Sequence, residues 1–380
     1  MNKLAIDLTY QPVGGALSQI KELINNVNIY DFDKVVFYIT RDNLHLFKGT
    51  DSTKVELKIV RFSNKSIAIR TLWSQIISPI SLVLNNISIS FCTGNISPII
   101  CSRKKAQWIG TVGPFVGGFI SSFPWRQRFI LFVSKYLTIF SAFTSNLVIF
   151  ESFYTKDLFV SKYGQKDIKS ATFHIGRDDY FYSVEKINKV NGVDCKNIDF
   201  ILTVSHLYPY KNIEVLIESF YELKLYEKGL YLLIAGSVVD NAYYDKLQSM
   251  TKKLGVSKFI IFLGRVEKQS LRELYSMCKI FVFTSPYENF AYTLVEAMSC
   301  GAPIITTDTT AMPETCGDAA LYFQPESKKQ LSNQLLTYLN DENIRKKFKD
   351  RSVRKSNEYE NYALVNQRTN DALYALTLKV

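Results

Sequence analysis

Two carboxylates separated by eight positions, Glu288 and Glu296, are the residues of this chain with the most informative spacing. Residues 279–284 before them form a short apolar run rich in β-branched and aromatic side chains, which predicts a buried strand. The Gly-Ala-Pro run at 301–303 is a helix stop signal, so a helix is predicted from about 289 to 299. Glu288 then lies where a strand passes into a helix, and Glu296 lies two turns further on.

This spacing suits a ligand with three parts. At about 1.5 Å per helical residue, the two carboxylates are on the order of 12 Å apart. Between them lies a helix N-terminus, whose unpaired N–H groups bind anions. A sugar at one carboxylate, a diphosphate on the amides and a ribose at the other would fit the span. The alternative is an ordinary strand–helix unit with two exposed acids.

The run S-P-Y-E-N-F followed by E-A-M-S-C-G-A-P at 285–303 resembles the E-x7-E region of retaining glycosyltransferases of the GT-B architecture. It is most similar to family 4, the glycosyl transferases group 1 type. The resemblance implies an α/β fold of two facing Rossmann-like domains with a deep interdomain cleft. It also implies that Glu288 faces the donor sugar and that Glu296 binds the ribose hydroxyls. The donor-binding residues that follow from it are Asn289, Phe290 and Ala291.

A second signal lies at 202–220, where a strand is predicted to end near Ser205 and a helix to begin near Asn212, a good N-cap residue. Lys211, beside the helix start, can neutralise a diphosphate together with the helix dipole. In the family this place commonly reads G-R-L…K-G or K-N, which assigns Lys211 to the leaving phosphates. His206 stands where Arg is usual, and neutral imidazole lacks Arg's permanent charge and two-pronged donation. We expect His206 to donate one hydrogen bond or to become charged beside a phosphate; solvated surface side chains are the alternative for both residues.

Three weaker signals concern ligand loops. Gly14 and Gly15 follow the first predicted strand and let backbone N–H groups approach a ligand, as the family's Gly-Gly loop does; a simple tight turn is the alternative. Glu314 stands where the family often has an acid that braces the nucleotide loop, and helix capping explains it equally well. The D-x-D at 31–33 precedes a predicted strand, so we interpret it as a surface loop. We expect no metal and no cofactor, because Lys211 and the helix N-terminus supply positive charge.

The length and the composition of the chain indicate two globular α/β domains. Its 380 residues are 47% hydrophobic and 21% charged, which is typical of folded domains large enough to bury two cores. Predicted strands and helices alternate throughout, the pattern of parallel sheets. Strands are predicted at 3–8, 34–40, 55–60, 87–92, 107–112, 146–150, 170–173, 199–205, 230–235, 258–263, 279–284, 303–306 and 319–323, and the helices predicted in the first half are 16–27, 70–84, 125–142 and 154–163. We expect an N-terminal, acceptor-side domain at 1–177, a linker at 178–198, a nucleotide-sugar-binding domain at 199–357, and a C-terminal helix at 358–380 that crosses back to the first domain.

The positive charge of the chain is regional. The net charge of +11 comes from 46 basic and 35 acidic residues, yet no Asp or Glu occurs from Leu57 to Phe150. Within that range, residues 121–140 combine aromatic and aliphatic bulk with flanking Arg and Lys, which suits a helix at a membrane surface. Ordinary core packing and nucleic-acid binding are the alternatives; we expect a membrane surface and no nucleic acid. The basic residues expected to make this contact are Lys58, Arg61, Lys65, Arg70, Arg103, Lys104, Lys105, Arg126, Arg128 and Lys135.

Other features of the sequence bear on location. The six cysteines show no metal spacing and no C-x-x-C pair, which is typical of reduced cytosolic thiols. Asp7 comes too early for the apolar core of a signal peptide, and no run reaches 18 uninterrupted apolar residues. We expect a cytoplasmic protein, peripheral on the inner face of the plasma membrane.

These observations and the resemblance together predict a glycosyltransferase, a hexosyltransferase in kind, and the resemblance implies that it is a retaining one. It would move a sugar from a nucleotide-diphosphate donor to a lipid-linked saccharide in surface polysaccharide or O-antigen synthesis. Two alternatives stay open. One is a nucleotide-sugar epimerase of the same architecture, which would need acid–base groups in the cleft. The other is a catalytically inactive transferase-like subunit, which the His206 departure favours and which Glu288, Glu296 and Lys211 oppose.

Overall fold

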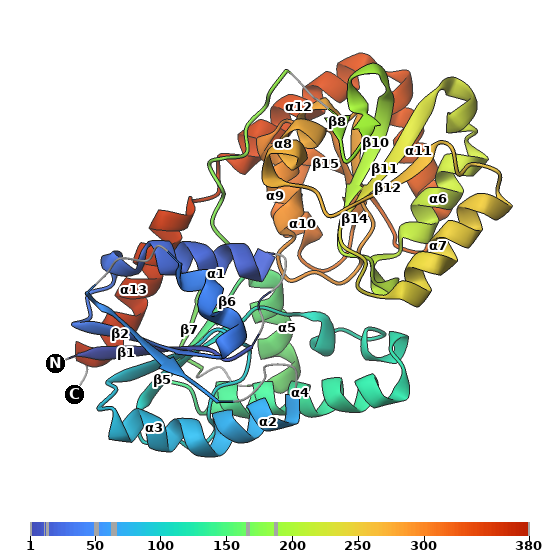
Figure 1. The fold of residues 1–380 in the computed structure, drawn as a ribbon. Coiled ribbons are helices and arrows are strands. Elements are labelled where there is room, and N and C mark those ends of the chain that lie inside the picture. The colour runs from blue at the N-terminus through green and yellow to red at the C-terminus, as the bar shows by residue number, and fades with distance from the viewer. Residues whose placement is uncertain are drawn as a thin grey trace. The chain divides into compact units, whose positions relative to one another are not determined.

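The chain folds into two α/β units, each built around its own parallel sheet (Figure 1). The computed structural model describes residues 2–10, 12, 15–48, 53–61, 67–164, 168–185 and 189–378. By their internal contacts, Met1–Gly176 and Glu360–Val380 form the first unit, and Arg177–Tyr359 form the second. Gly14 lies outside the described residues.

The sheet of the first unit has seven parallel strands in the order β3-β2-β1-β4-β5-β6-β7. Its central strands are buried on both faces, which explains why they appear in the sequence as nearly continuous apolar runs. The strand order reverses between β1 and β4: β2 and β3 extend the sheet on one side of β1, and β4 to β7 extend it on the other. The strands are β1 (Lys3–Leu8), β2 (Lys34–Ile39), β3 (Val55–Ile59), β4 (Ile89–Cys92), β5 (Lys104–Ile109), β6 (Leu147–Phe150) and β7 (Ser170–Thr172).

Helices cover both faces of this sheet. Since successive side chains of a strand point to opposite faces, the contacts of β1 separate the two layers. Leu4 of β1 belongs to one core cluster with residues of α1 and α13, whereas Ala5 packs with Trp73 and Leu82 on the other side. The helices are α1 (Gly15–Asn25), α2 (Ile67–Leu72), the π-helical segment η3 (Trp73–Ile77), α3 (Ser78–Leu84), α4 (Trp125–Phe143), α5 (Phe153–Tyr163) and α13 (Tyr362–Leu378).

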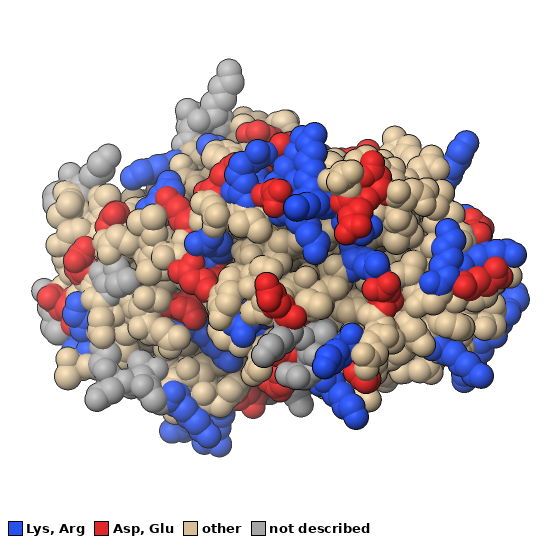
Figure 2. All heavy atoms as spheres, turned by 90° about the horizontal axis from the view of Figure 1, so that it is seen from above, with Lys and Arg blue, Asp and Glu red and all other residues tan. Residues whose placement is uncertain are grey.

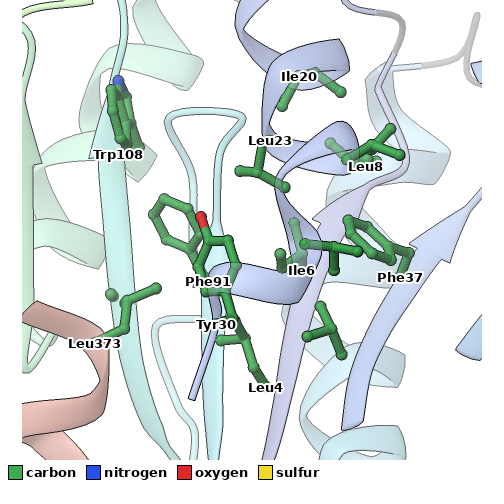
Figure 3. Close-up of a cluster of buried hydrophobic side chains, with 14 of the residues drawn as sticks. Leu4, Ile6, Leu8, Ile20, Leu23, Tyr30, Phe37, Phe91, Trp108 and Leu373 are labelled. Atoms are coloured by element: carbon green, nitrogen blue, oxygen red, sulfur yellow. The ribbon is translucent and has the colours of Figure 1, made fainter. Parts of the chain in front are cut away.

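The core under α1 and α13 holds the last helix to the first unit. Figure 3 shows Ile6 and Phe91 of the sheet close to Leu23 of α1, with Leu373 of α13 on the same side. The entry of α13 is equally tight: a Cβ on Gly176 would lie 2.6 Å from the backbone of Tyr362. The C-terminal helix is therefore an integral layer of the N-terminal unit.

The sheet of the second unit has six parallel strands in the order β12-β11-β10-β13-β14-β15, and its direction of growth reverses between β10 and β13. The strands are β10 (Asp199–Val204), β11 (Leu230–Ala235), β12 (Ile260–Gly264), β13 (Ile280–Phe283), β14 (Ile304–Thr307) and β15 (Ala320–Phe323). The helices are α6 (Ile213–Glu222), α7 (Asn241–Lys253), α8 (Lys268–Met277), α9 (Tyr292–Ser299), α10 (Met312–Cys316), α11 (Lys328–Asn340) and α12 (Glu342–Ser356).

The described residues of the segment expected as a linker, 178–185 and 189–198, pack with the second unit. They include a hairpin of β8 (Lys189–Val190) and β9 (Val193–Asp194). Asp178 forms an ion pair with Lys268 at 2.5 Å, and the backbone N–H of Val184 donates to Ser276 Oγ at 3.1 Å. Within the described part of the chain, no helix is both long enough and apolar enough to cross a bilayer.

One predicted boundary was wrong where it matters for the site. Helix α9 begins at Tyr292, three residues later than predicted, so Glu296 lies about one turn into the helix. Phe290 explains the delay, because its ring is buried against Tyr359 with centroids 5.5 Å apart, which holds residues 289–291 out of the helix. The predicted stop is confirmed: Gly301 has a φ of +73°, and the N–H of Ala302 returns to the carbonyl of Ala297, as in a Schellman motif.

Candidate functional site

The loops that follow β10 and β13 meet at one edge of the second sheet. Ligands of open parallel sheets bind at the carboxyl ends of the strands where the order reverses, and β10 and β13 flank that reversal. The hydroxyl of Thr284, just after β13, donates to the carbonyl of Lys211 at 2.6 Å. The two sequence segments with the strongest predicted chemistry are thereby joined.

Lys211 and Glu288 form the centre of this edge. Nζ of Lys211 lies 2.5 Å from Oε1 of Glu288, and the two side chains are only 11% and 18% exposed. Lys211 ends a short 3₁₀ turn, Pro209–Lys211, and its ammonium lies 5.0 Å from the ring centroid of Tyr210 and 5.6 Å from that of Phe283. A largely buried cation held on aromatic faces is well suited to receive an anionic ligand.

His206 lies beside this pair with one ring nitrogen unsatisfied. Its Nδ1 is buried and has no hydrogen-bond partner among the described residues. Burial first, and then the charges of Lys211 and Arg265, lower the pKa of His206 below its usual range. The imidazole is therefore neutral near pH 7, and it offers a hydrogen bond without a permanent charge.

A glycine allows the two strand ends to approach closely behind His206. Gly236 follows β11 with a φ of +143°, a conformation that side chains avoid. A Cβ at this position would lie 1.8 Å from the carbonyl oxygen of Ser205. Only a glycine at position 236 allows this close approach, and the contact fixes the backbone of Ser205 and His206.

Two threonines after β14 hold the Glu288 loop, and sequence reasoning missed both. Thr309 and Thr310 donate through their hydroxyls to the carbonyl of Pro286 at 3.0 and 3.3 Å, and the N–H of Glu288 donates to Thr310 Oγ1 at 3.3 Å. Thr310 has a φ of +50°, an outlier for a β-branched residue. The available signal was the position of this Thr-Thr pair, two residues beyond the carboxyl end of a parallel strand.

Glu296 occupies a desolvated position one turn into α9. The hydroxyl of Tyr275 donates to its Oε2 at 2.9 Å. Burial raises the pKa of Glu296 to about 8, with Asp178 adding to the rise, while the Tyr275 hydrogen bond and Lys268 oppose it. The carboxyl group is therefore largely protonated at pH 7.

The structure places the other predicted residues as follows. Asn289, Phe290 and Ala291 are buried between Glu288 and the start of α9, and Glu314 lies in the first turn of α10. Gly15 begins α1 in the first unit.

Asn212 occupies the N-cap position of α6, as predicted, but its side chain makes no capping hydrogen bond. This residue adopts a left-handed conformation, and its side-chain amide donates to the carbonyl of Pro325 at 2.8 Å. Its side chain therefore anchors the loop to a neighbouring segment instead of capping α6.

The first unit contains a cavity of about 300 Å³ at its own strand reversal, between the ends of β1 and β4. Polar groups from both strand ends and from α1 and α13 converge there. Its lining consists of Tyr10, Ala16, Gln19, Ile20, Leu23, Arg70, Thr93, Gly94, Asn95, Trp108, Gly110, Glu151, Asn366 and Thr369.

Glu151 is the most deeply buried ionisable group of this lining. Its side chain accepts a hydrogen bond from Trp108 Nε1 at 2.8 Å, and a Cβ on Gly110 would lie 2.9 Å from its Oε1. The lining also contains a cation, Arg70. Burial lowers the pKa of its guanidinium group, and the charge of Asp7 partly opposes this shift. Sequence reasoning missed this site, although Glu151 is the first acid after the acid-free range 57–150 and directly follows β6.

Comparison with known proteins agrees with the geometry of the second unit. Residues 184–355 match the family model of glycosyl transferases group 1. This range includes Lys211, Glu288 and Glu296. The match lies within the second unit, and the chain as a whole has the α/β fold of the GT-B glycosyltransferases.

Individual proteins give the same picture. The chain is similar to Anabaena Alr3699/HepE, solved in complex with UDP-glucose, with a TM-score of 0.75 over 99% of this chain and 100% of that one, at 16% identity. It is 28% identical over 179 residues to the serotype-specific mannosyltransferase WbdA of Escherichia coli, which is 47% of this chain and 22% of that protein.

A third similar protein has diphospho-undecaprenol, a polyprenyl lipid carrier, in its name. The chain is 25% identical over 185 residues to the N-acetylgalactosamine-N,N'-diacetylbacillosaminyl-diphospho-undecaprenol 4-alpha-N-acetylgalactosaminyltransferase of Campylobacter jejuni, 45% of this chain and 48% of that protein. The chain thus spans between about a fifth and half of the length of these two curated relatives.

Proposed function

We propose that this protein is a retaining glycosyltransferase of family 4, a hexosyltransferase that uses a nucleotide-diphosphate sugar. The observation that carries the proposal is the Lys211–Glu288 pair, enclosed at the carboxyl ends of β10 and β13. It lies inside the range that matches the group 1 family model. The names of similar proteins, a mannosyltransferase and a protein bound to UDP-glucose, support a nucleotide-sugar donor.

In the proposed mechanism, the diphosphate of the donor replaces Glu288 as the ion-pair partner of the Lys211 ammonium group. The charge that develops on the departing phosphate is stabilised by this ammonium, by the amides of Phe290 and Ala291, and by a hydrogen bond from His206. Glu288, released from the ion pair, orients the donor sugar. The leaving phosphate takes the acceptor proton on the same face, so the mechanism includes no general base, no metal and no cofactor.

Two further residues hold the nucleotide in this proposal. Glu296 binds the ribose hydroxyls, and Glu314 braces the loop that follows β14. Glu296 accepts hydrogen bonds best as a carboxylate, although the free protein keeps it largely protonated. Nucleotide binding should therefore release a proton from this group.

The acceptor is proposed to be a lipid-linked saccharide of a surface polysaccharide or O-antigen pathway. The cavity of the first unit offers a monosaccharide-sized space with an anion, a cation and amide groups, a lining that suits sugar hydroxyls. The similar Campylobacter jejuni protein carries diphospho-undecaprenol in its name, which supports a polyprenyl acceptor. Such an acceptor requires peripheral contact with a membrane surface, which we propose is the cytoplasmic face.

Calorimetric binding of UDP, GDP and ADP tests the donor site. We expect one nucleotide to bind the wild-type protein and Lys211→Ala to weaken it at least about tenfold, since a charge-assisted contact is lost. Lys246→Ala is the matched control, because Lys246 also pairs with a glutamate, Glu214, but lies on the surface of α7. Absence of binding by all three nucleotides at millimolar concentration would exclude the donor-site assignment.

Activity separates the proposed enzyme from its alternatives. Glu288→Gln should abolish sugar transfer to a polyprenyl-diphosphate saccharide while nucleotide binding persists, and the anomeric configuration of the product should match that of the donor. An inactive subunit would bind nucleotide and transfer nothing in the wild type. An epimerase would convert the nucleotide sugar without any acceptor.

A further inference from the structure

Two helical segments of the first unit expose an unusual amount of apolar surface. More than half of the exposed large hydrophobic side chains among the described residues come from residues 67–84 and from α4. In the first segment they are Ile69, Leu72, Ile76, Ile77, Ile80, Val83 and Leu84, and in α4 they are Trp125, Phe129, Ile130, Phe132, Val133, Tyr136 and Phe140. Apolar patches of this extent on a folded domain mark interaction sites.

The two segments cover the same face of the sheet. Trp73 and Leu82 pack on the face of β1 that carries Ala5, and Ile139 and Ala142 of α4 pack on Val148 and Phe150 of β6. The opposite face of β6, with Ile149, belongs to the core under α1 and α13. Figure 1 shows α2, α3 and α4 along one side of the first sheet, away from α1 and α13.

Hydrogen bonds through residues 97–99 tie the two segments together. The side chain of Gln75 in η3 donates to the carbonyl of Ser97 at 3.1 Å and accepts from the N–H of Ile99 at 2.9 Å. Lys105 donates to the carbonyl of Ile99 at 3.1 Å and to Thr144 Oγ1, at the end of α4, at 2.7 Å. The two segments thus cover the same face of the sheet and are linked through one loop, and their exposed sides are together called the apolar face here.

The charges around the apolar face differ from those expected from the sequence. Lys105 is buried, and Lys104 donates to the carbonyl of Leu376 at 2.9 Å, so neither can meet a membrane as predicted. Arg126 and Lys135 remain on α4, and no Asp or Glu occurs from Leu57 to Phe150. By contrast, the face drawn in Figure 2 carries acidic and basic side chains intermingled.

This charge distribution selects the occupant. A second copy of the chain would meet the same face of its partner, and residues 67–84 and α4 carry no acid that could offset Arg126 and Lys135 of the two copies. An anionic bilayer complements both properties: it accepts apolar side chains and attracts the cations. Trp125 begins α4, and the guanidinium carbon of Arg126 lies 5.4 Å from its ring centroid. Such a combination of an aromatic ring and a cation is typical of a membrane interface.

We propose that the apolar face inserts shallowly into an anionic phospholipid surface, and that apolar side chains contribute more to this binding than basic ones. The inference names the partner of the membrane contact in the proposed function, but it does not depend on the donor site. It also explains why α4 and residues 67–84 keep their large apolar side chains outside the core.

Vesicle flotation of the full chain tests the apolar face. Wild-type protein should float with vesicles that contain anionic phospholipid, and the double variant Ile76→Glu/Phe132→Glu should lower the partition coefficient at least about tenfold. Both side chains are about half exposed, so the fold tolerates the change. The matched control is Val239→Glu/Leu364→Glu, which adds the same charge at two equally exposed apolar positions outside the face.

Intrinsic fluorescence gives an independent measurement. The chain has three tryptophans, and Trp73 and Trp108 are buried while Trp125 is 73% exposed. Anionic vesicles should shift the emission to the blue, and Trp125→Phe should remove the shift. Raising the salt from about 0.1 to about 0.5 M, which screens charges, should weaken wild-type binding only a few-fold.

Several outcomes would overturn the inference. Wild-type protein that does not float, equal flotation of the two double variants, or complete release by salt would each exclude apolar insertion. A wild-type dimer in solution that only the Ile76→Glu/Phe132→Glu variant dissociates would assign the face to a second copy. Nucleotide binding, measured on the same variants, should be unchanged, so failure of this inference is distinguishable from failure of the donor site.

Discussion

Nζ of Lys211 and Oε1 of Glu288 lie 2.5 Å apart although the residues are 77 positions apart in the chain. The pair joins the loops after two neighbouring strands, β10 and β13. Glu288 thus already pairs with the ammonium group that the proposed diphosphate would bind. The free site is electrostatically satisfied, and ligand binding must exchange one anion for another.

This exchange predicts an unusual effect for Glu288→Gln. Removing the competing carboxylate should strengthen the binding of the sugar-free nucleoside diphosphate by about threefold to tenfold, although transfer is lost. Calorimetry measures it directly. Glu218→Gln is the control, since Glu218 also lies near a lysine, Lys328, but at an exposed position on α6. Weaker binding by Glu288→Gln would show that the pair does not compete with the phosphate.

The raised pKa of Glu296 predicts that nucleotide binding releases a proton. Its folded pKa of about 8 lies above the ordinary value of 4.5, so the free protein keeps it protonated at pH 7. If ribose hydroxyls bind the carboxylate, each binding event releases up to one proton, and affinity rises as the pH increases from about 6.5 to about 8. Calorimetry in two buffers with different ionisation enthalpies measures the released proton.

The control for this prediction is Glu296→Gln, which should bind weakly and release no proton from this position. The ionisation of the nucleotide's own phosphate is the same for both proteins and cancels in the comparison. Equal proton release by wild type and Glu296→Gln would remove Glu296 from the ribose site.

His206→Arg restores the residue that similar enzymes commonly carry. In the free protein the added guanidinium lies near Lys211 and Arg265, the two charges that already lower the pKa of His206, so stability should fall by about 1 kcal/mol. With diphosphate bound, the same charge is favourable, and nucleotide affinity should rise several-fold. Thermal unfolding with and without nucleotide measures both effects; a variant that is destabilised in both states would show that His206 does not face the phosphate.

Much of the fold was accessible from the sequence. Each of the thirteen strands of the two sheets was predicted, because strands buried on both faces are short apolar runs between turn signals. The least accurate strand was β5, which begins at Lys104 instead of residue 107, since a lysine pair at its start conceals the apolar pattern. Lys105 is buried only because three oxygen acceptors surround its ammonium, and such acceptors are set by tertiary structure.

The candidate site was accessible only where one segment supplies it. The spacing of Glu288 and Glu296 lies in a single strand–helix unit, but Thr310 reaches Glu288 from another strand end. The cavity of the first unit draws on six separate segments, so no local pattern reveals it. Exposure was equally invisible: the apolar periodicity of residues 70–84 predicts a helix, but it does not tell a core face from an exposed one.

Thr310 predicts a trade-off between stability and site geometry. Thr310→Gly removes both the strain of a positive φ and the hydroxyl that links Glu288 to Pro286. Unfolding stability should change by less than about 1 kcal/mol, because relief of strain offsets the lost hydrogen bonds. Transfer activity should fall at least about tenfold, since the Glu288 loop is no longer held. Thr310→Ser, which keeps the hydroxyl, should retain most activity; equal activity of both variants would make the hydroxyl irrelevant.

The approach of Gly236 to Ser205 predicts the most severe loss of stability. Gly236→Ala places a methyl group 1.8 Å from the Ser205 carbonyl, so the ends of β10 and β11 must separate and carry His206 with them. We expect a loss of more than about 3 kcal/mol in urea unfolding together with weakened nucleotide binding. Gly255→Ala is the matched control, because Gly255 also has a positive φ, +73°, but has open space around it. Its cost should be only about 1 kcal/mol, the conformational penalty alone. Similar losses for the two variants would mean that the strand ends can relax, and that the backbone of His206 is not fixed by this contact.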